Sequence, residues 1–421
     1  MLKRITWQRR AVVVTAAAAL VAAAMTTGVS GASGAPSVRG FDGTTIKVAG
    51  MGLASNFAGA DIGTKARFKR ANDTNEIKGV KLQYTEFADD KADPAVATTE
   101  ARRLVDQVGV FAIVPDLSPV NPGPYLNQQH VPYVGFAFDG TYCSPKPTTQ
   151  FYGFGFSGCV LPAAPNVMPD SYPQEYQYVA KKTGKTHPSI TIISNDTQSG
   201  KNSAKYQATG AQGGGFKVVY AKGNVPMTTS DYSPYIAQWF ASNGGKQPDL
   251  IQCLLATQCL PIWDALKAGG FKGTFQTPLG IDGFAKTLSG TISTSFFNIA
   301  PNPGLTQMEA DFAAASAPAT TPIFSQETYF AADMFIQALK TVVKKSGVKG
   351  ITPEAVQKVL ATQTWQINGL VGPIKYPAAT VVSTPACGEL ITSTGTAPWT
   401  VIAPYACSSK QFKIDPKFTG S

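Results

Sequence analysis

Six cysteines are the residues with the clearest chemical options in this sequence. They fall in three local pairs: Cys143 with Cys159, Cys253 with Cys259, and Cys387 with Cys407. A zinc site would need His or Cys at closer spacing, and neither His130 nor His187 lies near a pair. A Cys-x-x-Cys redox motif is absent from the sequence. We therefore expect structural disulfides, and among the connectivities that six cysteines allow we expect the sequential one.

The common catalytic motifs are missing from the sequence. It has no G-x-S-x-G, no H-E-x-x-H, no Walker loop and no G-x-G-x-x-G that opens a helix. The one close carboxylate pair at a predicted strand end, Asp89 with Asp90, is better explained as a solvated turn. We therefore expect a protein without catalytic residues, bound metal or cofactor.

Polar and aromatic residues gather instead just after the predicted strands. They are Asn56, Phe57, Ser118, Phe138, Asp139, Ser199, Thr257 and Asp282. Taken alone, each is most simply a loop residue. Ligands of open α/β sheets bind at the carboxyl ends of the strands, however, so the shared location of these residues favours a ligand-binding site.

The elements that must position these residues alternate between strand and helix. Apolar, β-branched runs predict strands, and polar or amphipathic stretches between them predict helices. The expected strands are 44–52, 81–90, 110–116 and 131–139 in a first series, and 189–196, 216–225, 248–256 and 273–280 in a second. This alternation predicts an α/β fold with two doubly wound parallel-sheet lobes, each covered by helices on both faces.

Two predicted helices begin with clear signals or carry a clear apolar stripe. Asp93 and Pro94 fit the N-cap and N1 positions of a helix over 93–109. A long helix over 325–347 carries Ala331, Phe335 and Leu339 on one face. Three passages between lobes are expected near 152–158, 290–302 and 366–377, and such crossings build a two-lobed clamp.

The first residues are typical of a secretory signal peptide. Lys3, Arg4, Arg9 and Arg10 precede an apolar run over 11–25, and small residues follow up to about residue 35. The Arg9-Arg10 pair leaves a twin-arginine signal open as an alternative. The apolar run is short for a membrane span, and a later span is not expected. No cysteine lies near the cleavage region, so we expect an exported, soluble protein without a lipid anchor.

The charge of the chain does not indicate nucleic-acid binding. The formal net charge is +10, and it falls to +6 once the four leader cations are removed. The lysines are scattered, and no Lys/Arg block or basic-aromatic repeat is present. A solvated surface explains this distribution better than a nucleic-acid interface.

The order of these pieces resembles the type 1 periplasmic binding proteins. The segments that carry the resemblance are "IKVAGMGLASNFAGADIGTKARFKRAND", "YTEFADDKADPAVATTEARRLVDQ", "IISNDTQSGKN", "PDLIQCLLATQCLPIWDALKAGGFKGTFQTPLGID" and "SQETYFAADMFIQAL". They cover about residues 44–380 and are most similar to the branched-chain amino-acid (leucine/isoleucine/valine-binding) type that serves ABC importers. The resemblance implies a small solute held between two lobes, and no catalysed reaction.

The resemblance also implies a division of the chain and roles for some residues. The expected division is 44–155 with 300–370 for lobe 1, 156–299 with 371–410 for lobe 2, and 411–421 for a C-terminal tail. Ser118 and the Phe138-Asp139 turn fall where the family holds a ligand carboxylate, and Asp282 falls where it pairs with an ammonium group. Two positions depart from the family pattern: Ser199 stands in place of a tyrosine, and Phe138-Asp139 in place of Ala-Thr.

Three functions fit the sequence. The first hypothesis is a monomeric, exported protein that delivers a small organic solute, an amino acid or a related or aromatic compound, to an ABC permease. The second is the ligand-binding part of a sensory system, and the third is a secreted hydrolase. Phe57, Phe136, Phe138 and Tyr142 would suit a ligand with an apolar or ring face.

The resemblance places the pair Cys253 and Cys259 in lobe 2, at the turn between a strand and the following helix. A bond between them would close a short loop from a lobe 2 strand to the following helix, beside the binding cleft. Such a small loop gains little stability from unfolded-state entropy. Its expected effect is to fix the shape of the "LLATQ" segment, including Thr257.

Overall fold

The computed structural model describes most of the chain beyond the predicted signal peptide, which lies outside the described residues. The described residues are 38–120, 122–137, 140–142, 151–158, 167–170, 173–319, 321–376, 387–408 and 410–413. Among them, no helix is long and apolar enough to cross a membrane.

The first sheet has five parallel strands in the order β2-β1-β3-β4-β5. The strands are β1 (Thr45–Gly52), β2 (Lys81–Asp89), β3 (Ala112–Leu117), β4 (Tyr133–Gly135) and β5 (Gly153–Gly155). The first four coincide with strands predicted from apolar, β-branched runs, which suit strands buried on both faces. The order is that of a doubly wound sheet, with its switch point between β1 and β3.

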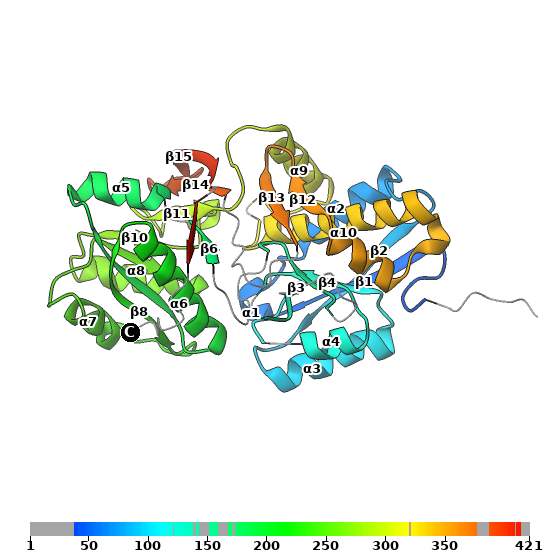
Figure 1. Cartoon of the computed structure of the whole chain (residues 1–421), viewed down its shortest axis with the longest axis horizontal. Helices are drawn as coiled ribbons and strands as arrows, with labels where there is room; N and C mark the ends of the chain where they lie inside the picture. Colours follow the sequence, from blue (N-terminus) through cyan, green and yellow to red (C-terminus); the bar gives the residue numbers. More distant parts are fainter. Residues whose placement is uncertain are drawn as a thin grey trace, which may run out of the picture. The chain divides into compact units, whose positions relative to one another are not determined.

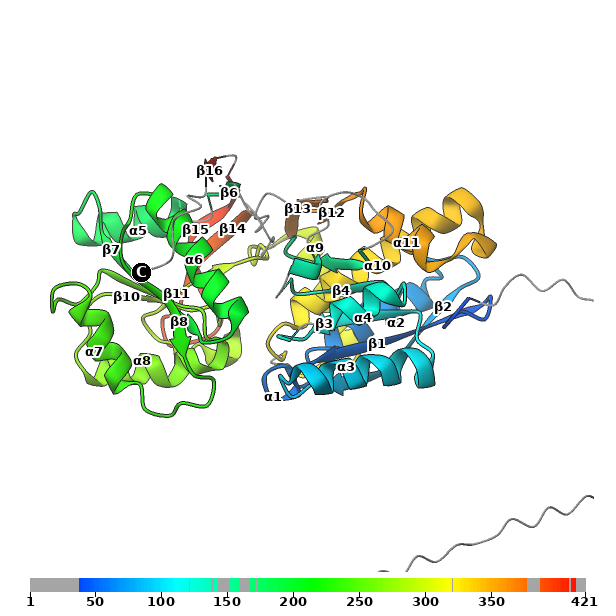
Figure 2. The same ribbon diagram turned by 60° about the horizontal axis from the view of Figure 1, so that its bottom comes forward.

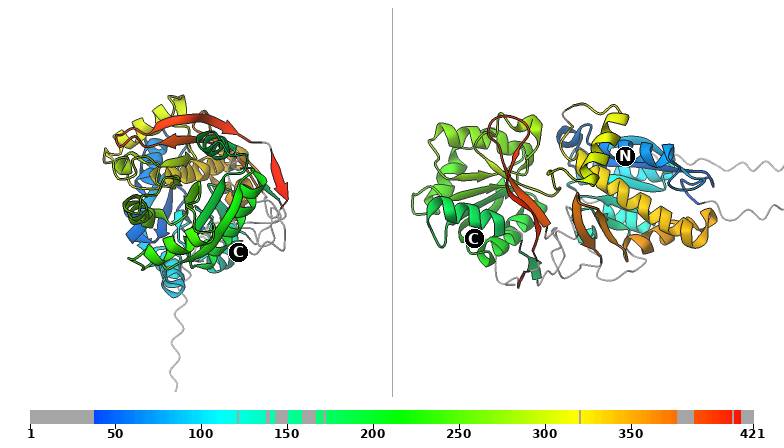
Figure 3. Two further views of the ribbon diagram at one scale, coloured as in Figure 1. Left: turned by 90° about the vertical axis from the view of Figure 1, so that its left-hand side faces the viewer. Right: turned by 90° about the horizontal axis from the view of Figure 1, so that it is seen from above.

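The second sheet repeats this order and extends it. Its seven strands follow the order β15-β14-β11-β10-β9-β7-β8, in which the five from β11 to β8 are parallel. The strands are β7 (Ser189–Asn195), β8 (Lys217–Val225), β9 (Leu250–Cys253), β10 (Thr274–Gln276), β11 (Ile292–Ser295), β14 (Cys387–Thr392) and β15 (Thr400–Cys407). The last two are antiparallel and continue the sheet beyond β11 (Figure 3). The predicted α/β fold with two mainly parallel sheets is confirmed.

Helices cover both faces of the first sheet (Figure 2). One core joins the sheet to α2 (Ile62–Asp73), α10 (Ser325–Ser346) and α11 (Pro353–Leu360). The other joins it to α3 (Pro94–Arg102), its π-helical continuation Arg103–Val108, and α4 (Gly123–Gln128). Both predicted helix signals are confirmed: Asp93 caps α3 by accepting the backbone N–H groups of Ala95 and Val96, and the stripe of α10 is buried.

The second sheet is covered in the same way (Figures 1 and 2). Apolar residues of α7 (Ser233–Ala241) and α8 (Cys259–Ala268) pack on one face, and those of α5 (Pro173–Thr183) and α6 (Gln198–Gly213) on the other. The remaining elements are α1 (Ala54–Phe57), α9 (Pro303–Ala314), the pair β12 (Thr364–Ile367) and β13 (Val371–Lys375), the pair β6 (Val167–Pro169) and β16 (Gln411–Lys413), and short 3-10 turns at Gly140–Tyr142, Ala256–Gln258, Asp282–Phe284 and Val348–Gly350.

The β12-β13 hairpin is the last part of the described chain before β14 of the second sheet, and it packs on the helices of the first sheet. Val371, Ile374 and Tyr376 are buried in the core that contains α2 and α10. We therefore propose to place residues 371–376 in the first lobe rather than in the second, because burial in a shared core decides which lobe a strand moves with. The first lobe below means the first sheet with the elements packed on it, and the second lobe means the second sheet with its helices.

A buried ion cluster fixes α10 on α2. Arg67 on α2 is fully buried and donates from Nη1 and Nη2 to Glu76 at 2.8 and 2.9 Å and from Nε to Asp333 on α10 at 2.7 Å. Nearby, Gly63 on α2 approaches α10 so closely that a Cβ atom there would lie 1.9 Å from the carbonyl oxygen of Ser325. These contacts set the position of the first turn of α10.

Replacing Arg67 with alanine should therefore strongly destabilise the protein. The change takes the closest cation away from the buried Asp333 and from the partly buried Glu76, and breaking a buried ion pair typically costs about 3–5 kcal/mol. Lys69→Ala on the same helix is the control, because its ion pair with Asp73 is exposed and worth about 1 kcal/mol or less. Urea denaturation followed by circular dichroism measures both. Equal losses of unfolding free energy would contradict a stabilising role for the cluster.

The same cluster predicts a loss of stability in acid. Burial alone would raise the pKa of Glu76, but hydrogen bonds and charges from Arg67 and Lys340 lower it from 4.5 to about 2. A carboxylate whose folded pKa is lowered stabilises the fold above its unfolded pKa and loses that contribution as the pH falls through the folded value. The free energy of unfolding should drop between pH 4.5 and about 2. In Glu76→Gln this part of the drop should disappear, and a wild-type pH profile in that variant would refute the assignment.

Candidate functional site

The described residues line a cavity of about 770 Å³ where the carboxyl ends of strands from both sheets meet. The second sheet contributes the ends of β9, β10 and β11, and the first contributes the turns after β4 and β5. The first turn of α10 supplies a further part of the wall. The volume lies within the range of small-molecule sites, about 300–1,000 Å³. The strand-end rule that suggested a binding site in the sequence is consistent with this location.

Three phenylalanines form an aromatic wall in the cavity. The ring of Phe136 lies 5.7 Å from Phe156 and 5.6 Å from Phe324, and Phe156 lies 6.5 Å from Phe324. Phe324 precedes the first residue of α10 and has a φ of 67°, a left-handed conformation that is unusual for a bulky residue. Phe296, with Phe297 4.9 Å away, adds further ring surface to the lining. A solute in this cavity would contact a largely apolar wall.

A buried glutamate lies on the polar side of the cavity. Glu175, in the first turn of α5, is 2% exposed and accepts hydrogen bonds from Gln276 Nε2 at 3.1 Å and from the Thr294 hydroxyl. Burial raises its pKa from 4.5 to about 7 despite these hydrogen bonds. The Oε1 atom of Gln276 is buried and has no hydrogen-bond partner in the described part of the chain. The network therefore keeps one buried acceptor in the cavity wall.

Two further glutamates lie in or behind the wall. Glu327 belongs to the first turn of α10 and lines the cavity, and burial raises its pKa to about 7 although its carboxylate accepts its own backbone N–H. Glu389 on β14 is fully buried behind the lining and accepts the N–H of Ile299 at 2.5 Å. Burial also raises the pKa of Glu389. The cavity is thus bordered by carboxyl groups whose ionised forms are poorly solvated.

Of the eight ligand-binding residues predicted from the sequence, Asp282 belongs to the cavity lining. It is exposed, and its Oδ1 accepts the backbone N–H of Trp399 at 3.3 Å. Phe57 lies one layer behind the wall, with its ring 5.1 Å from that of Phe324. Both positions remain compatible with a role at the site.

The other predicted residues are elsewhere or are not described. Ser118 is buried in the turn after β3, where its hydroxyl donates to the carbonyl oxygen of Val120, and it does not line the cavity. Asn56 and Thr257 are partly exposed and also do not line it. Phe138, Asp139 and the side chain of Ser199 lie outside the described residues.

Sequence reasoning missed the cavity residues that matter most here: Glu175, Gln276, Phe324 and Glu327. One usable signal was present, because Gln276 is the only amide in the predicted strand "GTFQTPLG" and is the last residue of β10. No local pattern marks Phe324 or Glu327, whose positions depend on how α10 docks on α2. Among the described residues, no group of three or more His, Cys, Asp or Glu could hold a metal ion.

Two disulfides border the cavity, and both were predicted. The Cys253–Cys259 bond joins the end of β9 to the start of α8 across 6.0 Å between Cα atoms, and Cys253 and Leu254 line the cavity. Thr257, expected to contact the solute from this loop, instead lies outside the lining because the chain turns at Ala256, which has a φ of 46°. Cys143 and Cys159 lie outside the described residues.

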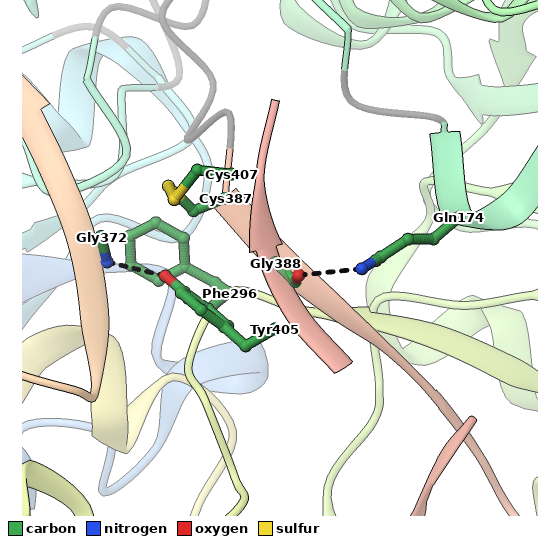
Figure 4. Close-up of a disulfide and its surroundings, with 7 residues drawn as sticks. All are labelled: Gln174, Phe296, Gly372, Cys387, Gly388, Tyr405 and Cys407. Carbon is green, nitrogen blue, oxygen red and sulfur yellow. Dashed lines mark hydrogen bonds between the residues drawn. A yellow bond between two sulfur atoms is a disulfide. The ribbon is translucent and has the colours of Figure 1, made fainter. Parts of the chain in front are cut away.

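The Cys387–Cys407 bond lies where the two lobes touch (Figure 4). It joins β14 to β15, and a Cβ atom on Gly372 of β13 would lie 2.4 Å from Cys387 Sγ. Next to it, the hydroxyl of Tyr405 accepts the N–H of Gly372 at 2.7 Å. On the other side of β14, Gln174 donates to the carbonyl oxygen of Gly388 at 3.3 Å. The disulfide therefore holds the strand pair that contacts the first lobe.

Comparisons with known proteins give the family. The sequence model of a family described as "Periplasmic binding protein" matches residues 46–381. The chain belongs to the periplasmic binding protein family. The sequences of curated proteins give no significant match to this binding protein.

Solved structures with the same fold include proteins with bound solutes. One, from Thermus thermophilus, is described as a branched-chain amino acid ABC transporter with bound valine; it has a TM-score of 0.68 and 14% identity and covers 87% of this chain and 97% of its own. Two from R. palustris are solute-binding proteins of ABC transporters. The benzoate complex has a TM-score of 0.65 and 14% identity, and the match covers 87% of this chain and 98% of that one. The 4-hydroxybenzoate complex has a TM-score of 0.61 and 19% identity, and the match covers 88% of this chain and 98% of that one. These likenesses establish the type 1 periplasmic binding protein fold.

Peptide mapping of the unreduced protein tests the disulfides at the site. We expect all six cysteines to be paired sequentially, so that alkylation of the denatured, unreduced chain labels no thiol. The reduced chain is the control and should take six labels. A labelled Cys253 or Cys259, or a peptide that joins either residue to another cysteine, would contradict the loop described above.

Proposed function

We propose that the chain is an extracytoplasmic solute-binding protein that holds one small organic solute between its two lobes and delivers it to an ABC importer. The observation that carries the proposal is the cavity at the strand ends of both sheets, in a chain that belongs to the periplasmic binding protein family. The solute complexes of the structural neighbours support a ligand of about that size. The predicted signal peptide over residues 1–35 and the disulfides support export.

Binding would act by shifting the population of lobe arrangements. A solute that contacts both lobes at once stabilises the arrangement in which both walls reach it. Asp282 at the rim of the cavity and Phe57 behind its wall are proposed to contribute to this site. Ser118, Asn56, Thr257, Ser199 and the Phe138-Asp139 turn remain proposals for contacts made as the lobes close. We propose no catalytic role for any of them.

A thermal-shift screen with amino acids, amides, amines, sugars and aromatic acids tests the function. A solute present at about 100 times its Kd should stabilise the folded protein by about 2.7 kcal/mol and raise its Tm. Mass spectrometry of the freshly purified protein should detect a retained solute of the same class. A screen in which no compound raises the Tm, with no solute retained, would refute the proposed function.

A matched pair of variants shows whether the stabilising solute occupies this cavity. Phe296 and Phe240 are both partly buried, but Phe296 lines the cavity while Phe240 stacks on Phe271 in the second lobe. Phe296→Ala should reduce the ligand-induced rise in Tm, because it removes ring surface from the wall. Phe240→Ala should keep the rise. The reverse result would place the solute elsewhere.

A further inference from the structure

We propose that the solute of this cavity is an organic cation with an apolar body. This inference rests on the proposed function and narrows it, since amino acids and aromatic acids both carry a carboxylate. The cavity lining contains four acidic residues, Glu175, Asp282, Glu309 and Glu327. No lysine, arginine or histidine is found among the described lining residues. A solute carboxylate would therefore be desolvated there without a cationic side chain, which is costly.

The acidic residues of the cavity would be stabilised by a positively charged solute and would repel a negatively charged one. Glu175 is surrounded by the neutral Gln276 on β10 and Thr294 on β11, and the charge of Asp170 raises its pKa further. Glu327 has its own backbone N–H as a hydrogen-bond donor. This contrasts with Glu76 in the first lobe, where Arg67 and Lys340 supply the countercharge. An ammonium group between the lobes would supply it to the cavity.

The aromatic wall suits the rest of such a solute. The faces of aromatic rings attract cations, by about 0.5–2 kcal/mol depending on how far the site excludes water. Phe136, Phe156 and Phe324 provide three rings within 6.5 Å of one another on the wall. Apolar substituents on the cation would also bury surface against these rings. A compact metal ion would gain none of this contact, so the geometry favours an organic cation.

The unpartnered oxygen of Gln276 is an independent pointer to a donor on the solute. The side chain is 5% exposed and lines the cavity, and its Nε2 is engaged by Glu175 and Thr294. This engagement fixes the orientation of the amide, so that Oε1 is left without a partner. An amide oxygen can only accept a hydrogen bond. The atom itself is buried, so a solute reaches it only when the side chain turns toward the cavity; an N–H group then satisfies the oxygen, and a carboxylate does not.

The first turn of α10 is a feature of the described wall that would favour an anion. The N-terminus of a helix carries a partial positive charge. Here Glu327 occupies it, because its carboxylate accepts its own backbone N–H. The helix therefore already has an internal anion at this position.

Charge and pH together give a test whose sign separates the two kinds of solute. The pKa values of Glu175 and Glu327 are raised to about 7. A bound cation favours the ionised carboxylates, so binding should release protons and tighten as the pH rises from about 6 to about 8. A bound carboxylate would instead favour the protonated forms and should bind more tightly at the lower pH.

Three probes with the same phenyl group and different charges provide the experiment. Titration calorimetry compares 2-phenylethylammonium, 2-phenylethanol and 3-phenylpropanoate at both pH values, in two buffers of different ionisation enthalpy. We expect the ammonium probe to bind at least roughly tenfold more tightly than the other two, a difference of about 1.4 kcal/mol. Its binding should release protons. An ammonium probe that binds no better than the carboxylate, or that binds more weakly as the pH rises, would overturn the inference.

Variants assign the effect to the cavity. Glu175→Gln and Glu327→Gln should each reduce the preference for the ammonium probe and its pH dependence. Asp73→Asn is the matched control, because it removes one negative charge from an exposed pair on α2 and should leave both unchanged. Equal effects of all three variants would point to net charge and overturn the assignment to the cavity. A neutral or anionic solute from the metabolite screen would refute the cation while leaving the proposed function intact.

Discussion

The parallel direction of the strands is the constraint on which the site depends. In each sheet, five parallel strands place all their carboxyl ends at one edge, so the turns that follow them must gather there. Short turns cannot cross back over the sheet, and helices occupy both of its faces. The cavity lining reflects this arrangement, since the ends of β9, β10 and β11 and the turns after β4 and β5 all contribute. Local sequence then decides only which side chains stand at that edge.

Buried charge is handled in opposite ways in the core of the first lobe and at the cavity. In the first lobe, Arg67 is enclosed completely, but two carboxylates pair with it, and the cluster fastens α10 to α2. At the cavity, Glu175 and Glu327 are desolvated, and none of the described lining residues is a lysine, arginine or histidine. The first arrangement stabilises a fixed structure. The second leaves carboxyl groups without a countercharge, which a cationic ligand could supply. One of these groups, Glu327, lies at the start of α10, the helix that the Arg67 cluster holds in place.

The fold was readable from the sequence because it depends on periodic patterns. Apolar runs identified the central strands of both sheets, and Asp93-Pro94 marked the start of α3. The elements β11 and α9 were missed, since "ISTS" is short and polar and lies within the predicted passage 290–302, and α9 begins directly after that passage at Pro303. The site was less accessible. Arg67 pairs with Asp333, 266 positions away, and only the docked helices reveal that a residue from a polar stretch is buried.

The site residues were missed for the same physical reason. The strand-end rule pointed to the edge of the sheet at which the cavity lies, and it could have selected Gln276. It could not tell a side chain that faces the cavity from one that forms its own turn, as Ser118 does with Val120. That distinction depends on backbone conformation, and left-handed residues such as Ala256 redirect the chain without a sequence signal.

The left-handed backbone of Phe324 has an evolutionary consequence. A glycine would adopt this conformation freely, whereas a residue with a side chain pays about 1 kcal/mol or more. Drift under selection for folding alone would therefore favour glycine or asparagine at this position. Persistence of an aromatic residue there among descendants of a common ancestor would mark lineages that retained the same cargo, and its loss would mark lineages in which that cargo changed.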